Sequence, residues 1–91
     1  MAKTLKLQVT EDDIRLGKRG DPCNCPVARA LKRQTRLPVH VDAAGAVRLG
    51  KAGPLLYSPS VRTERFVDAF DVFGRDSVKP LTLSLKPMAQ K

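Results

Sequence analysis

Leucine and valine alternate with polar residues near both ends of this 91-residue chain. The alternation runs through residues 5–10 (LKLQVT) and again through residues 81–86 (LTLSLK). Because successive side chains of a strand point to opposite faces, a period of two is typical of a strand that buries one face. Each of these two segments is therefore expected to form a strand with one side against the core.

The segment 21–36 (DPCNCPVARALKRQTR) predicts a helix. Pro26 suits a first helical position, where no N–H is needed, so Cys25 or Asn24 becomes the N-cap. Leu37 precedes a proline and avoids helical dihedral angles, so the helix should end near residue 35 or 36. The apolar residues of this helix form one stripe: Val27, Ala30, Leu31. The basic residues at spacings of three and four share the opposite side: Arg29, Lys32, Arg33, Arg36.

A longer helix is expected over residues 61–73 (VRTERFVDAFDVF). Ser58 or Ser60 can cap its start near Pro59, and Gly74 ends it. Its apolar residues, spaced to face a core, are Phe66, Val67, Phe70 and Phe73. Its acidic residues line another face, where they are an alternative partner for the basic helix of a second copy in a homodimer: Glu64, Asp68, Asp71.

Shorter patterns fill the rest of the chain. Thr10 and Asp13 resemble a capping box at the start of a short helix that stops at Gly17. Residues 39–49 predict a hairpin whose 43–45 turn uses the positive φ of Gly45, and residues 54–58 are a candidate for one more strand.

The expected order is therefore β, α, α, β, β, a candidate β, α, β. Strands and helices are mixed without regular βαβ alternation, which favours an α+β fold over a doubly wound sheet. We expect one domain over residues 1–91, with loose ends at 1–3 and 87–91. Its mostly antiparallel sheet of four to five strands should be covered by two main helices.

Positive charge dominates the first half of the chain. The sequence has 17 Lys and Arg against 9 Asp and Glu, a net charge of +8. Between residues 15 and 51 the only acids are Asp21 and Asp42. A field of this sign favours polyanionic partners, namely nucleic acid, an acidic protein surface or anionic lipid.

The basic helix, the loop before it and the hairpin after it form the predicted binding site. Its residues are Lys18, Arg19, Arg29, Lys32, Arg33, Arg36, Arg48 and Lys51. Such residues contact phosphates, so nucleic acid is the first expected partner. The alternative is a host-factor inhibitor, a protein that docks this face on a host or antiviral-defence complex. With three phenylalanines assigned to the core, Tyr57 alone is left to stack on a base, which argues against a single-strand reader.

Catalytic and metal chemistry have little support in the residues. Cys23, Cys25 and His40 are too few, and the cysteines too close together, for a usual zinc site. Cys25 at a helix start near basic residues could be a reactive thiol, but a small side chain tucked under the helix is favoured. No phosphate-binding glycine loop, nucleophile elbow or zinc-protease motif is present. We therefore expect a non-enzymatic protein without cofactor or metal.

The chain resembles small phage and prophage accessory proteins of unassigned function. The segments that carry the resemblance are 12–14 (DDI), 17–20 (GKRG), 25–31 (CPVARAL), 66–67 (FV), 70–71 (FD) and 80–85 (PLTLSL). Members of that group often end in a Pro-Phe-x-Phe strand, where this chain has leucines at 81 and 83. The resemblance implies a viral protein that acts in the cytoplasm of a bacterial host. The absence of an apolar run of about 20 residues agrees with a cytoplasmic rather than a membrane location.

Overall fold

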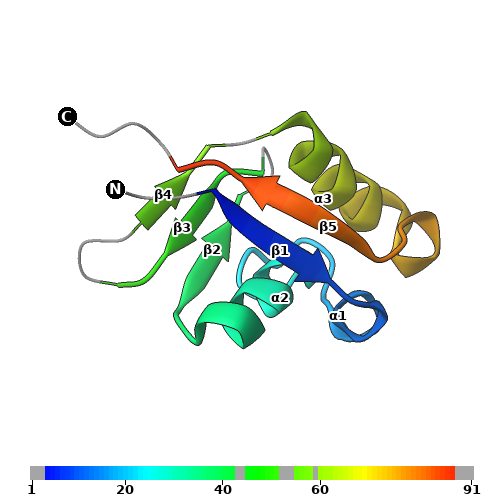
Figure 1. The fold of residues 1–91 in the computed structure, drawn as a ribbon. Helices are drawn as coiled ribbons and strands as arrows, with labels where there is room; N and C mark the ends of the chain where they lie inside the picture. The colour runs from blue at the N-terminus through cyan, green and yellow to red at the C-terminus, as the bar shows by residue number, and fades with distance from the viewer. Residues whose placement is uncertain (1–3, 43–44, 52–54, 59, 88–91) are drawn as a thin grey trace.

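The computed structural model describes residues 4–42, 45–51, 55–58 and 60–87 (Figure 1). In chain order the elements are β1 (Leu5–Val9), α1 (Glu11–Leu16), α2 (Pro26–Thr35), β2 (Val39–Val41), β3 (Val47–Leu49), β4 (Leu55–Tyr57), α3 (Val61–Phe73), a 3₁₀ turn η1 (Arg75–Ser77) and β5 (Leu81–Leu85). This order confirms the α+β class and includes the candidate strand as β4. The structure does not describe residues 1–3, 43–44, 52–54, Pro59 and 88–91. The expected loose ends at 1–3 and 87–91 therefore lie outside the described residues, apart from Pro87.

The strands form two antiparallel sheets instead of the single sheet that was expected. β1 pairs with β5, with Leu7 opposite Leu83, while β2, β3 and β4 form a three-stranded sheet in that order. The two sheets touch where the Ser58 N–H donates to the Lys86 carbonyl at 2.8 Å, beside a single bridge between Tyr57 and Pro87. Because β4 and β5 meet only at this bridge in the described part of the chain, one continuous sheet does not form.

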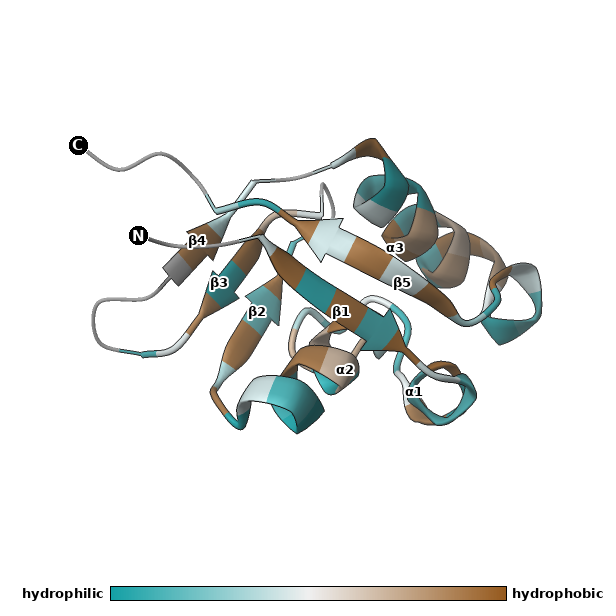
Figure 2. Ribbon diagram, in the orientation of Figure 1, coloured by the Kyte–Doolittle hydropathy of each residue, from teal (hydrophilic) through white to brown (hydrophobic). Residues whose placement is uncertain are grey.

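The core lies between the sheets and the two main helices. On the β1–β5 pair the inward side chains are Leu7, Val9, Leu83 and Leu85, all buried. In Figure 2 apolar and polar residues alternate along these strands, as a period of two requires. The three-stranded sheet contributes Val39, Val41, Val47, Leu49 and Tyr57 to the same core. Tyr57, expected as the one aromatic free to stack on a base, is therefore buried.

Helix α2 begins and ends close to the expected residues. Cys25 is its N-cap and accepts a hydrogen bond from the Ala28 N–H through Sγ at 3.4 Å. Pro26 occupies the first turn, and the helix ends at Arg36, which adopts a left-handed conformation with φ 60°. The stripe of Val27, Ala30 and Leu31 is buried, as expected.

Helix α3 confirms most of its expected pattern and corrects one residue. Ser60 is the N-cap, and Phe66, Val67 and Phe70 are buried. Phe73, however, is 73% exposed. The last turn of α3 lies against the loop that carries Arg19 and Gly20, not against the apolar core, so helical spacing alone misplaced this side chain.

Helix α1 packs closely on the start of α2. Gly17 ends α1 with an ordinary extended φ of −69°, so a left-handed conformation is not the reason for glycine there. A Cβ at residue 17 would lie 2.8 Å from both the Asp13 carbonyl oxygen and Pro26 Cδ. Gly17 therefore permits a close approach between the two helices, and this approach positions the basic loop of residues 18–24.

Candidate nucleic-acid interface

The eight predicted site residues fall into two groups, depending on whether the side chain is free at the surface or held within the molecule. Four have exposed side chains with no side-chain hydrogen bond or close ion pair in the described part of the chain, although the charge of Lys18 acts on nearby Asp21: Lys18, Arg36, Arg48, Lys51. Of the other four, three bind groups inside the molecule, namely Arg19, Lys32 and Arg33, and the fourth, Arg29, is half-buried with an unpartnered Nε among the described residues. The predicted basic surface is thus smaller than the sequence suggested.

Three of the exposed residues belong to the three-stranded sheet or to the segments that adjoin its β2 and β3 strands. Arg36 follows α2, and the Gly50 N–H donates to the Pro38 carbonyl at 2.8 Å, which places residues 50–51 beside the end of that helix. Arg48 projects from the outer face of β3, opposite His40 on β2. We call Arg36, Arg48 and Lys51 the sheet-end cluster. Lys18 lies at the other end of α2, where its N–H donates to the Asn24 carbonyl at 2.8 Å.

Arg33 has an internal structural role. Its Nη2 lies 2.7 Å from Asp13 Oδ2 and 3.0 Å from the Gln8 carbonyl oxygen, so it joins α2 to α1 and β1. Burial on its own would raise the pKa of Asp13, but the hydrogen bonds from Arg33 and Thr10 and the charge of Arg33 outweigh it and lower that pKa. Half of the Arg33 side chain is still in solvent, yet its charge is already paired with a carboxylate.

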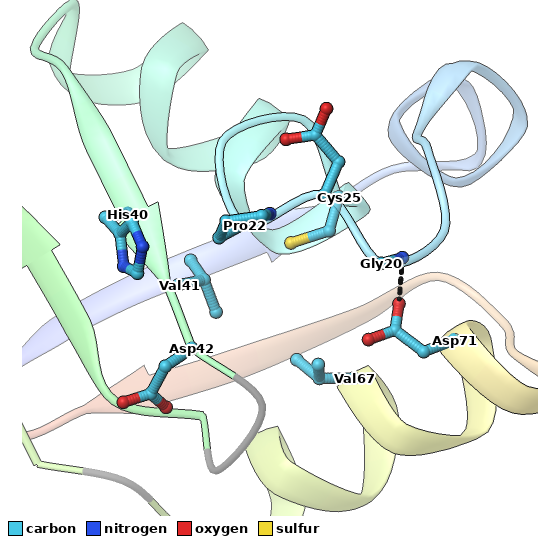
Figure 3. A pocket seen from close by; sticks show the side chains of 9 residues that line it. Gly20, Pro22, Cys25, His40, Val41, Asp42, Val67 and Asp71 are labelled. Atoms are coloured by element: carbon cyan, nitrogen blue, oxygen red, sulfur yellow. Dashed lines mark hydrogen bonds between the residues drawn. The ribbon is translucent and has the colours of Figure 1, made fainter.

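Arg19 binds the end of α3. Its Nε donates to the Asp71 carbonyl at 3.0 Å and its Nη2 to the Val72 carbonyl at 2.6 Å, so the guanidinium caps the negative end of the helix. The Gly20 N–H donates to Asp71 Oδ1 at 2.9 Å (Figure 3). Asp71, expected on a face free for a second copy, instead fixes this loop.

Arg29 and Lys32 lie half-buried along α2. Lys32 Nζ is 3.3 Å from Asn24 Oδ1, which ties the helix to the loop before it. Arg29 Nε is buried and has no hydrogen-bond partner within the described residues. Neither side chain is available in full to an external phosphate.

The free edge of β1 is closed by a side chain of α2. Gln34 Oε1 accepts from the Gln8 N–H at 2.8 Å, and Gln34 Nε2 donates to the Lys6 carbonyl at 3.2 Å. One amide thus occupies two of the backbone groups on this edge, and Arg33 occupies a third, the Gln8 carbonyl. This arrangement protects a sheet edge that would otherwise be open to another chain.

Cys25 lines a pocket of about 280 Å³ between α2, β2 and α3 (Figure 3). The thiol is 3% exposed, and burial raises its pKa, the opposite of what a reactive thiolate requires. His40 is exposed on the outward side of β2, as expected, and Figure 3 shows it beyond Val41 from the thiol. The geometry therefore favours the packing role of Cys25. Within the described residues, no three His, Cys, Asp or Glu side chains are arranged to hold a metal ion.

A second basic groove was missed by the sequence argument. Arg62, Arg65 and Lys79 line a groove of about 380 Å³ whose apolar wall includes Phe66 and Leu81. Residues 62–76 contain four acids, so the net charge of this segment did not indicate a basic site. Arg62 and Arg65 are nevertheless three residues apart and lie on one side of α3. Only the chain path after η1 brings Lys79 beside them.

Comparisons with protein-family models, curated proteins and solved structures gave no match. The resemblance to phage accessory proteins therefore stays a prediction. None of the helices formed by the described residues has both the length and the apolar character needed to cross a membrane.

Proposed function

We propose that this protein binds nucleic acid, without catalysing a reaction, through the sheet-end cluster supported by Lys18. One observation supports this most directly. The chain carries a net charge of +8, yet the described residues contain two ion pairs, Arg15–Asp12 and Arg33–Asp13. Because Lys and Arg outnumber Asp and Glu by eight, at least eight positive charges have no acidic counterpart in the chain and can act on phosphates. The phage-type accessory role in a bacterial cytoplasm belongs to the same proposal.

The expected binding is electrostatic and sequence-tolerant. A protein that neutralises phosphates releases counterions, so the logarithm of the binding constant falls linearly with the logarithm of salt concentration. Each phosphate contact adds about 0.9 to that slope on duplex DNA. The three side chains of the sheet-end cluster should therefore account for a slope of up to about 3.

The test is fluorescence anisotropy with labelled mixed-sequence DNA and RNA, from about 50 to about 200 mM salt. The triple variant Arg36→Ala, Arg48→Ala, Lys51→Ala should bind more weakly and with a lower salt slope. The matched control removes the same number of charges from the groove: Arg62→Ala, Arg65→Ala, Lys79→Ala. Absence of binding at the lowest salt would refute the proposal, as would an equal loss in both triple variants.

The groove supports a second candidate, binding to an acidic protein surface such as that of a host or antiviral-defence complex. Arg62, Arg65 and Lys79 surround an apolar wall, and none has a side-chain partner in the part of the chain that the structure describes. Cations beside apolar surface suit a partner that offers carboxylates next to apolar residues. Charge reversal with Arg65→Glu and Lys79→Glu should abolish capture of such a host protein and leave nucleic-acid binding intact. If capture persists, the groove is not the docking surface.

A further inference from the structure

A polar pocket of about 330 Å³ lies between α1 and the end of α3. Its walls include the guanidinium-bearing residues Arg15, Arg19 and Arg75, the acid Asp76 and the aromatic ring of Phe73. These residues come from four parts of the chain, namely α1, the loop after it, the end of α3, and the turn η1 that follows α3. Because Arg15 is ion-paired with Asp12, the excess positive charge of the pocket comes from Arg19 and Arg75 against the single acid Asp76.

Phe73 is the unusual member of this set. The chain has four aromatic residues, and the other three, Tyr57, Phe66 and Phe70, are buried. Phe73 is exposed to solvent on the wall of a pocket that contains arginines. Exposing a large apolar ring forgoes the free energy that burial would provide, so the position stabilises the fold little. An exposed ring beside cations is, however, what a base-stacking site needs.

The arginines of the pocket are held to different degrees. Arg19 is fixed by hydrogen bonds from its Nε and Nη2 to carbonyls at the end of α3, which leaves its Nη1 out of both bonds. Arg15 shares an exposed ion pair with Asp12 at 3.0 Å. Arg75 has no side-chain partner among the described residues. The pocket therefore combines one pre-positioned guanidinium with one that is free to meet a ligand.

We propose that this pocket binds an unpaired base and its neighbouring phosphate from a single-stranded nucleic acid. The base stacks on Phe73, and Arg75, assisted by Arg15, contacts the phosphate, since guanidinium groups can bind phosphate with two parallel hydrogen bonds. This inference rests on the proposed function in taking nucleic acid as the partner. It adds a preference for single strands, against which the expected burial of Phe73 had argued.

The experiment compares three labelled oligonucleotides of about 12 nucleotides by anisotropy: oligo-dT, an abasic strand with the same number of phosphates, and a duplex. Stacking of one base predicts that oligo-dT binds about 5- to 150-fold more tightly than the abasic strand. Phe73→Leu keeps an apolar side chain but removes the ring, so it should abolish this ratio by weakening the binding of oligo-dT. Val72→Ala is the matched control, because Val72 is also exposed on the last turn of α3 but is not part of the pocket.

Each outcome decides between the two proposals. Equal binding of oligo-dT and the abasic strand by the wild type overturns the base pocket and leaves the proposed function standing. A ratio that survives in Phe73→Leu, or disappears in Val72→Ala as well, also overturns the pocket. No binding of any oligonucleotide at low salt overturns both proposals. If Phe73→Leu fails to fold by circular dichroism, NMR of the wild type with oligo-dT decides, because amide shifts must include residues 73–76.

An acidic peptide is the rival occupant of this pocket. A peptide with aspartates and one aromatic residue, added to the wild type in the same assay, should not compete with oligo-dT at concentrations comparable to that of the oligonucleotide. Competition that is lost in both Phe73→Leu and Arg75→Ala would assign the pocket to a protein partner and overturn the proposal.

Discussion

Asp13 is the one carboxylate that the structure buries among the described residues. It accepts hydrogen bonds from the Thr10 N–H at 2.9 Å, the Thr10 hydroxyl at 3.0 Å and Arg33 Nη2 at 2.7 Å. The same carboxylate therefore completes the capping box of α1 and anchors α2. A buried charge is tolerated only when it is paired and hydrogen-bonded, and Asp13 meets both conditions.

Arg33→Ala is expected to lower the free energy of unfolding by about 1–3 kcal/mol, because it leaves a buried carboxylate without its charged partner. Arg36→Ala is the matched control, since Arg36 is exposed and its side chain has no partner within the described part. It should change stability by no more than about 0.5 kcal/mol. Urea unfolding at neutral pH measures both. Equal effects of the two substitutions would contradict the structural role of Arg33.

The lowered pKa of Asp13 also makes stability depend on pH. A carboxyl whose pKa is lower in the folded state contributes stability above its unfolded pKa and loses it as pH falls through the folded pKa. The contribution of Asp13 should therefore decline from about pH 4 downward. Asp13→Asn removes this titration, so its stability deficit relative to the wild type should be smaller at pH 3 than at pH 7. A deficit that does not change with pH would refute this prediction.

The two thiols should differ in reactivity. Cys25 is buried with a raised pKa, whereas Cys23 is half-buried on the loop before α2. Because the thiolate is the reactive form, a thiol reagent should modify Cys23 in the native protein and Cys25 only after denaturant is added. Cys23→Ser should remove the native-state reaction. Rapid modification of Cys25 in that variant would restore the reactive-thiol alternative.

At the scale of elements, the main helix–strand contact is made with polar side chains as well as apolar ones. α2 places Leu31 in the core, and three residues later Gln34 closes the edge of β1. β1 is thus paired with β5 on one side and with an amide side chain on the other. A strand covered on both edges gives little opportunity for pairing with a second chain.

Gln34→Ala is expected to open that edge. The amide of Gln8 should exchange with solvent faster, and the protein should lose about 1 kcal/mol of stability for the hydrogen bonds removed. Gln34→Glu is an informative control, because a carboxylate still accepts from the Gln8 N–H but does not donate to the Lys6 carbonyl. Hydrogen exchange by NMR, with sedimentation to detect self-association, measures the effect. Unchanged protection of Gln8 in Gln34→Ala would contradict the capping role.

At the scale of the whole molecule, stability and surface charge compete at Arg36. Arg36 ends α2 in the left-handed region, at φ 60°, where glycine is the favoured residue. Its N–H still donates to the Lys32 carbonyl at 2.8 Å, so the backbone of the cap does not need the arginine side chain. A side chain that costs stability at an exposed position is consistent with a role in binding.

Arg36→Gly should therefore raise the free energy of unfolding by about 0.5–1 kcal/mol while weakening nucleic-acid binding and reducing its salt slope by about 0.9. Thermal or urea unfolding and anisotropy on the same sample measure the two effects. Because this substitution should raise the stability and lower the affinity, a loss of binding would not be explained by a loss of folding. A stabilised variant with unchanged binding would remove Arg36 from the proposed interface.

The sequence by itself determined the elements and most of the faces that they bury, with Tyr57 and Phe73 as exceptions. Thr10 with Asp13, Pro26, and Ser58 or Ser60 marked the helix starts, because capping depends on residues only two or three positions apart and proline suits the first helical position. Strand faces followed from alternation in the same way, and so did the α+β class. The net charge, and with it the kind of partner to consider, needed no structure.

The tertiary structure alone decided which cations are free, which aromatic residue is exposed and how the strands are divided. Arg19 and Arg33 looked like surface residues, but each binds a group more than 15 residues away in the chain. Tyr57, expected at the surface, is buried beside β3, and Phe73, expected in the core, is exposed beside Arg75. Local spacing determines the direction in which a side chain leaves its own helix or strand. What that side chain meets depends on long-range packing, and packing placed an exposed ring and three arginines around one pocket.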